Sequence, residues 1–277
     1  MQRAQAALLP GGRLHLNHGP IDLIVGVSGP ARDAAYARAS RRFATVLTEL
    51  VCELPALRQP PSQGSHFDGA IARRMAAAVA PFAEFITPMA AVAGAVADEM
   101  IAVIRQDPNV AKAYVNNGGD VAFHLAAGQT LAAAIPHTGE ATITASDDIR
   151  GVATSGWRGR SHSLGIADSV TVLARSAAAA DAAATLIANA VDLPGNPNIR
   201  RRPANALAPD SDLGHRQVTI DVPALDPSDK RIALDRGCTA AQGFAACGLI
   251  VAAVLLLQGE TRTTGELAPP RLETSDA

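Results

Sequence analysis

Six short apolar segments, each ended by a turn, lie between Ala111 and Ala174, and they constrain the fold more than any other feature of the chain. Short apolar or alternating segments bounded by Gly, Asn, Asp and Ser predict β-strands. Because the connections are short, an antiparallel meander is the simplest assembly of these strands. The predicted strands are 113–115, 121–126, 130–135, 141–145, 151–155 and 166–174.

Alanine-rich segments with helical spacing flank this strand region. Residues 31–57 and 68–79 are predicted helices, and a third at 87–105 begins with Thr87 as its N-cap and Pro88 at its first position. Ser176 caps a fourth helix that continues to about residue 191. Only 3% of the residues are aromatic, so the core is built from Ala, Val, Leu and Ile. We expect an α+β fold, with packed helices on both sides of a mainly antiparallel sheet.

The chain of 277 residues is predicted to form a single domain over 1–259. Its parts are an N-terminal hairpin and helices (1–110), a β-rich core with the alanine helix (111–192), and a loop, a strand and a C-terminal helix (193–259). Residues 192–209, with Arg200, Arg201 and Arg202, are predicted as an exposed loop. The apolar run 244–257 is shorter than a membrane span of ~20 residues, and it predicts a buried helix over 239–258. Residues 260–277 are predicted to be a flexible tail.

The net charge and the number of cysteines limit the kinds of partner and the cellular location that we expect for the chain. The net charge is −2 without a basic stripe, which argues against nucleic acid, and no segment predicts a membrane anchor. Three scattered cysteines do not make a disulfide framework and fit a reducing, cytoplasmic location. A small-molecule cofactor or substrate is the expected partner, and a homo-oligomer stays open.

The first candidate site is the turn formed by Asn116, Asn117, Gly118, Gly119 and Asp120. Two adjacent glycines allow positive φ and close approach of a ligand to the backbone. The Asn and Asp side chains supply more hydrogen-bonding groups than a turn requires. The alternative is a purely structural hairpin turn.

A second cluster ends the predicted strand 151–155. Thr154, Ser155 and Gly156 precede a glycine-containing loop with two arginines and His162, which suits phosphate or carboxylate binding. A polar surface loop, with His162 solvated instead of acting as a base, is the alternative. Asp168 at the entry of the next strand faces a cleft or pairs with an arginine.

A third cluster lies on the alanine-rich helix. Asp181 and Thr185 are four residues apart, so their oxygens project from one face and offer the hard ligands that Mg²⁺ prefers. The alternative is that Asp181 complements the helix dipole while Thr185 bonds a backbone carbonyl.

Taken in order, these motifs resemble the ApbE-like superfamily, whose best-known members are FAD:protein FMN transferases. The shared pattern is a Gly-Gly-Asp turn, a Thr-Ser-Gly strand end, a Ser-Val-Thr-Val strand and an Asp-Ala-Ala-Ala-Thr helix, between about residues 85 and 192. The runs 85–94, 115–120 and 165–170 look like an uncharacterised branch of that superfamily. Some members of this branch are associated with tetrahydromethanopterin-dependent one-carbon metabolism.

The resemblance implies an ApbE-like fold and a cofactor pocket for FAD or a pterin. By the match, Asp181 and Thr185 hold Mg²⁺ together with a backbone carbonyl from residues 90–93. The cofactor lies between Thr87, the turn 116–120 and the strand end 154–156, and Asp120 or Asp168 orients the substrate or acts as a base. The implied activity is that of a Mg²⁺-dependent transferase or a step in one-carbon cofactor biosynthesis.

Two departures from the transferase pattern keep an alternative open. The motif His-x-x-Asp-Pro-x-Thr-Gly is missing from the interval 158–167, and no lysine occurs in 91–98. The alternative is a non-catalytic ligand-binding or assembly protein that kept the fold and lost the flavin-transferase chemistry.

Overall fold

The computed structural model describes residues 3–62, 66–135 and 139–265. Its centre is a nine-stranded antiparallel sheet with the strand order β1-β2-β3-β4-β5-β8-β9-β12-β13. These strands are β1 (Gln5–Leu8), β2 (Leu14–His18), β3 (Ile21–Ser28), β4 (Lys112–Asn117), β5 (Asp120–Leu125), β8 (Gly151–Ser155), β9 (Ser169–Ala174), β12 (Ala252–Leu257) and β13 (Glu260–Gly265). Two further hairpin-like pairs are β6 (Thr130–Ile135) with β7 (Gly139–Thr144), and β10 (Arg200–Pro203) with β11 (Gln217–Asp221).

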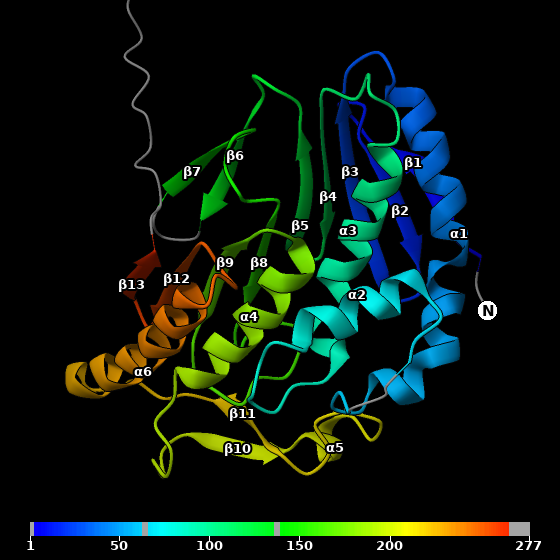
Figure 1. Cartoon of the computed structure of the whole chain (residues 1–277). Coiled ribbons are helices and arrows are strands. Elements are labelled where there is room, and N and C mark those ends of the chain that lie inside the picture. The colour runs from blue at the N-terminus through cyan, green and yellow to red at the C-terminus, as the bar shows by residue number, and fades with distance from the viewer. Residues whose placement is uncertain (1–2, 63–65, 136–138, 266–277) are drawn as a thin grey trace, which may run out of the picture.

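The helices are α1 (Arg32–Leu57), α2 (Ala70–Val79), α3 (Val92–Ile104), α4 (Ala177–Ala190), the short α5 (Ala204–Leu207) and α6 (Pro227–Ala246), and a 3₁₀ turn η1 (Pro88–Ala91) precedes α3. The long helices pack against one another on one face of the sheet (Figure 1). The main apolar core lies between this helix layer and the sheet. On the other face, the β6–β7 hairpin covers a second cluster that includes Phe123, Ile143 and Leu173. The α+β class is therefore confirmed, but the expectation of helices on both sides of the sheet is wrong.

Most local predictions are confirmed. The helices α1, α2 and α4 match the predicted segments, and the Ser176 hydroxyl accepts a hydrogen bond from Ala179 N (3.1 Å) as the cap of α4. The third predicted helix is divided into η1 and α3, and Thr87 makes no capping bond with its side chain. The predicted strands are all present, although the last begins at Ser169. They do not form a simple meander, because β6 and β7 leave the main sheet and β5 pairs directly with β8.

The predicted buried helix over 239–258 is wrong. Helix α6 ends at Ala246, Gly248 takes a positive φ of 69°, and the remaining apolar residues form β12. Every residue of β12 is buried, with Leu255 and Leu257 in the main core and Val254 in the second cluster. A strand covered on both faces has no polar alternation, so its apolar run looks the same as that of a buried helix.

Two segments predicted to lack regular structure contain strands and, in one of them, a short helix. Residues Glu260–Gly265 of the predicted tail form β13 and pair with β12, while 266–277 lie outside the described residues. The predicted loop 192–209 contains β10 and α5, and Arg201 of β10 pairs with Asp192. In the described part of the chain, no helix is both long and apolar enough to cross a membrane.

Candidate functional site

The β4–β5 turn, the end of β8 and the start of β9 lie at the same end of four inner strands of the main sheet. Asn117 pairs with Asp120 across the turn, and Thr154 pairs with Thr171 between β8 and β9. In antiparallel pairs, directly opposite side chains share a face of the sheet. Strand β5 pairs with β8, and Thr154 N donates to Asp120 Oδ1, so the predicted residues of the first two clusters are neighbours in the structure.

The turn itself uses its glycines and Asn116. Gly118 and Gly119 have φ values of 66° and 116°, and Asn116 Oδ1 accepts a hydrogen bond from Gly119 N (2.9 Å). A β carbon at Gly118 would lie 2.1 Å from Arg160 Nη2, so the guanidinium of Arg160 sits directly on the turn. Asn116 thus has a structural role in the turn, while Asn117 is left for another partner.

Asn117 reaches the start of α3. Its Nδ2 donates to the carbonyl oxygen of Ala93 (3.1 Å), and the next amide, Gly94 N, donates to Asp181 Oδ2 on α4 (3.0 Å). A β carbon at Gly94 would lie 2.2 Å from the carbonyl oxygen of Ala177. The glycine therefore allows α3 and α4 to approach closely, and this approach places Asp181 of α4 against the Gly94 amide of α3.

Buried Asp120 and half-buried Asp181 form an acidic pair. Asp120 is 8% exposed, and its Oδ1 accepts a hydrogen bond from Thr154 N (3.2 Å). Burial raises the pKa of Asp120 to about 7, against the weaker opposing effects of the Thr154 amide and Arg160. Burial and the nearby charge of Asp120 raise the pKa of Asp181 well above its usual value. Among the described residues, neither carboxyl group forms a salt bridge, so this pair favours a proton or an added cation.

A third carboxyl group, which the sequence analysis missed, borders the pair. Asp98 on α3 accepts hydrogen bonds from Ala177 N (3.0 Å) and Ala178 N (2.9 Å), the first amides of α4. Burial raises its pKa despite these bonds, and Asp98 in turn raises the pKa of Asp181. Its position beside Glu99 in an otherwise apolar helix was the available sequence signal, because acids in such a helix require partners.

The oxygen donors near this pair suit Mg²⁺. Asp181 offers a carboxylate, Ala93 a carbonyl, and Thr185 lies one helical turn beyond Asp181 on the same face of α4 and is half-buried. In the described part of the chain, no group of three or more His, Cys, Asp or Glu side chains is arranged to hold a metal. Mg²⁺ commonly uses one or two carboxylates and completes its shell with water and phosphate oxygens, so this donor set fits.

Asp168 directly precedes β9, and several partners hold its carboxylate. Gln258 N donates to its Oδ2 (2.5 Å), Trp157 Nε1 donates to its Oδ1 (3.3 Å), and Arg158 pairs with it at 3.3 Å. Of the two sequence interpretations, pairing with an arginine is confirmed. Gly156 lies against the backbone of Asp168, because a β carbon there would be 2.4 Å from its carbonyl oxygen.

Of the remaining predicted residues, Thr154 and Thr87 have side-chain partners. Thr154 Oγ1 hydrogen-bonds Thr171 Oγ1 (2.9 Å), and buried Thr87 donates to Asp212. Ser155 is half-buried beside them, and His162 is exposed on its loop. Trp157, with the Arg158 guanidinium 4.9 Å from its ring centre, is an aromatic group that the sequence analysis passed over. No observation tests the predicted binding or catalytic roles, which stay predictions.

Known proteins resemble this chain over most of its length. A family model described as "AbpE bacteria" matches residues 6–263. A UPF0280 protein of Methanopyrus kandleri is 32% identical over 174 residues, which cover 61% of this chain and 69% of the relative. Another UPF0280 protein, from Methanococcoides burtonii, is 38% identical over 117 residues, and the match spans 39% of this chain and less than half (47%) of that relative.

A solved structure is also similar. The flavinyl transferase ApbE of Pseudomonas stutzeri, in its apo form, aligns over 95% of this chain and 95% of its own, with 13% identity and a TM-score of 0.46. A TM-score this low does not assign a fold, so the classification rests on the sequence matches. The chain belongs to the AbpE bacteria family, an ApbE-like family that includes UPF0280 relatives.

Proposed function

We propose that this protein binds a phosphate-bearing cofactor of the flavin or pterin type through Mg²⁺ and catalyses a group transfer from it. The observation that carries the proposal is the acidic pair of buried Asp120 and half-buried Asp181, beside the main chain of Ala93 and Gly94. Two interacting acids that form no salt bridge among the described residues are costly in a folded protein. A divalent ion that also binds phosphate oxygens removes this cost.

Asp181, Thr185 and the Ala93 carbonyl are the residues that would hold Mg²⁺. When bound, the metal neutralises phosphate charge and stabilises the charge that develops on a leaving group. The Gly94 amide already orients the Asp181 carboxylate at 3.0 Å. Asn117 Nδ2 donates to the same Ala93 carbonyl (3.1 Å), so the turn is tied to the start of α3 at this point.

The turn and its neighbours provide the rest of the pocket. Gly118 and Gly119 expose backbone without β carbons, and Arg160 lies at the turn, where a cation complements phosphate. Trp157 is half-buried beside Asp168 and is a suitable surface for a planar heteroaromatic ring. Asp120, with its pKa near 7, is suited to accept or donate one proton near neutral pH. Asp168 is a positioning residue that holds Trp157 and Arg158 in place.

A second candidate function is ligand binding without catalysis. The absence of the His-x-x-Asp-Pro motif from 158–167 and of a lysine from 91–98 favours it. Both candidates require a ligand at Asp181, so binding and turnover are measured separately.

The binding test is thermal unfolding of the protein with FAD, FMN, ADP and a pterin, each with MgCl₂ or with EDTA. At a ligand concentration ~100 times Kd, we expect the Tm to rise by roughly 5–10 °C with Mg²⁺. Asp181→Asn keeps an oxygen that accepts the Gly94 amide but removes the charge, so it should lose the Mg²⁺-dependent part of the shift. Asp148→Asn is the matched control, because Asp148 is exposed and pairs only with Arg175 among the described residues.

Turnover is measured as AMP release from FAD, because transfer of the FMN part breaks the pyrophosphate bond. Mg²⁺-dependent binding with AMP release supports the transferase. Binding without AMP release, over a range of protein acceptors, supports the non-catalytic alternative. The proposal fails if none of the four ligands raises the Tm, or if Asp181→Asn and Asp148→Asn behave alike.

A further inference from the structure

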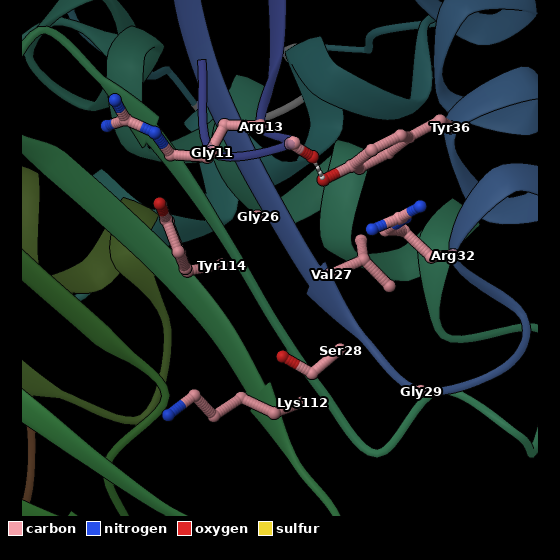
Figure 2. A pocket seen from close by; sticks show the side chains of 11 residues that line it. Gly11, Arg13, Gly26, Val27, Ser28, Gly29, Arg32, Tyr36, Lys112 and Tyr114 are labelled. Carbon is pink, nitrogen blue, oxygen red and sulfur yellow. Dashed lines mark hydrogen bonds between the residues drawn. The ribbon is translucent and has the colours of Figure 1, made fainter. Parts of the chain in front are cut away.

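We propose that a second site, separate from the acidic pair, binds a small phosphorylated molecule in a cationic cavity at the opposite end of β3 and β4. The cavity has a volume of about 380 Å³, and its charged lining side chains are Arg13, Arg32 and Lys112. This volume lies in the ~300–1,000 Å³ range that is usual for small-molecule sites. Figure 2 shows these side chains around the C-terminal part of β3, near Gly26 and Ser28.

The cavity exists because β2 is shorter than β3. Pairing between them ends at Leu14 and Val25, whereas β3 continues to Ser28 and pairs there with β4 alone. The space beside 26–28 is bounded by the β1–β2 loop and by the first turns of α1 (Figure 2). The Tyr36 hydroxyl of α1 donates to the carbonyl oxygens of Gly12 (2.9 Å) and Val25 (3.3 Å). These bonds fix the loop against the helix, so the cavity is held open by defined contacts.

The charge of the lining is entirely positive. Arg13 comes from the loop, Arg32 from the start of α1 and Lys112 from β4, and no acidic residue lines the cavity. Arg32 pairs with Asp33, whose side chain is 88% exposed, and Lys112 Nζ donates to the carbonyl oxygen of Thr130 (3.0 Å). A surface ion pair is weak, so Arg32 remains available to a ligand. The partial positive charge at the start of α1 adds to that of the side chains.

The lining favours a phosphate over a single carboxylate. Arg13, Arg32, Lys112 and Ser28, which carry two guanidinium groups, an ammonium group and a hydroxyl, line the cavity from different elements. A phosphate monoester carries up to two charges and three terminal oxygens, which use donors from several directions. A carboxylate has two coplanar oxygens and satisfies one guanidinium. The donor geometry therefore matches the phosphate group better.

Gly26 and Tyr114 make room for an organic part of the ligand. A β carbon at Gly26 would lie 2.2 Å from Cε1 of Tyr114, so the absent side chain lets the tyrosine ring lie against β3. Figure 2 shows Tyr114 on β4 beside Gly26 of β3, where it lines the cavity. Tyrosine combines an apolar ring with a hydroxyl donor, and it packs against sugars or bases. We infer a ligand with a phosphate and a small ring.

This site is independent of the proposed cofactor site. Lys112 begins β4 and Asn117 ends it, so these residues of the two sites lie about 17 Å apart along the strand. Their charges are also opposite, because one is built from carboxyl groups and the other from cationic groups. A ligand of the cationic cavity needs no metal ion, and metal-free binding separates the two sites in experiment.

The test is isothermal titration calorimetry with AMP, inorganic pyrophosphate and citrate, in EDTA and at low ionic strength. We expect AMP and pyrophosphate to bind and citrate to bind at least tenfold more weakly. The double variant Arg13→Gln/Arg32→Gln should weaken AMP at least tenfold, and both residues are exposed, so the fold should persist. Arg236→Gln is the matched control, because Arg236 is exposed on α6, which packs against α4, β12 and β13.

Tyr114→Ala separates the two parts of the ligand. It should weaken AMP and leave pyrophosphate unchanged, because only AMP has a ring to place on the tyrosine. The proposal is overturned if AMP and pyrophosphate fail to bind at millimolar concentration, if citrate binds as tightly as AMP, or if Arg236→Gln weakens AMP as much as the double variant. Circular dichroism of each variant verifies that it is folded.

Discussion

At the scale of single residues, Gly94 decides how closely α3 approaches α4. The Ala177 carbonyl oxygen occupies the space that its missing side chain leaves, 2.2 Å from where a β carbon would stand. Backbone on both sides resists movement, so a methyl group there pushes the helices apart. This contact also determines the distance between the Gly94 amide and Asp181, and thus couples packing to the candidate site.

We therefore expect Gly94→Ala to lower the free energy of unfolding by about 1–3 kcal/mol. The matched control is Gly243→Ala on α6, where a β carbon meets no atom within 4 Å. That change should raise stability by about 0.5–1 kcal/mol, because alanine is the better helix former. Urea unfolding of both variants measures the difference. Equal effects of the two substitutions would contradict the close helix approach.

Asp120 makes stability depend on pH. Its pKa is about 7 in the folded protein and 3.8 in the unfolded chain, so the folded state holds more protons between these values. Stability is thus greatest at low pH within this window and falls as the pH rises, by up to about 1.4 kcal/mol per pH unit. Asp120→Asn should flatten this dependence between pH 4 and pH 7 in EDTA. Urea unfolding at several pH values measures it, and an unchanged slope would show that the carboxyl is not the source.

At the scale of elements, the start of α4 is capped twice. Ser176 caps Ala179 N from within the helix, and Asp98 accepts the amides of Ala177 and Ala178 from α3. The first cap follows from local sequence, whereas the second depends on how α3 lies on α4. Together they satisfy three of the four amides that a helix start leaves free.

Removing each cap should lower the free energy of unfolding by a different amount. Ser176→Ala loses one hydrogen bond, and we expect a cost of about 1 kcal/mol. Asp98→Ala leaves two part-buried amides without an acceptor, and it should cost about 2–4 kcal/mol. Asp98→Asn retains one acceptor oxygen and should fall between them. Thermal or urea unfolding gives the order of the three variants, and a larger loss for Ser176→Ala would contradict the tertiary cap.

The elements also show where local sequence patterns are sufficient to predict secondary structure. The apolar spacing of α1 and the Ser176 cap of α4 depend on residues within a few positions, and both were predicted correctly. The segment 244–257 failed because burial on both faces removes the polar alternation by which a strand is identified. Asp98 was missed for a related reason, since its partners lie 79 and 80 residues away.

At the scale of the whole molecule, the strands of the main sheet differ in burial, and so we expect their amides to differ in protection from hydrogen exchange. Strand β12 is paired on both sides, with β9 and β13, and is buried along its length, whereas β1 is an edge strand with four exposed residues. Local opening has a free energy that follows burial and hydrogen bonding. We expect amide hydrogen exchange to be slowest in β12 and fastest among the sheet strands in β1. Faster exchange in β12 than in β1 would contradict this arrangement.

The sequence by itself determined the secondary structure of most segments, the α+β class, the family and the two polar clusters at the strand ends, because these depend on residues near one another in the chain. Only the tertiary structure decided that the long helices share one face of the sheet and that Asp98, Asp120 and Asp181 meet. It also placed Arg13, Arg32 and Lys112 around one cavity. These groups come from separate elements, and their convergence depends on strand order and helix packing, which long-range burial sets and local periodicity does not encode.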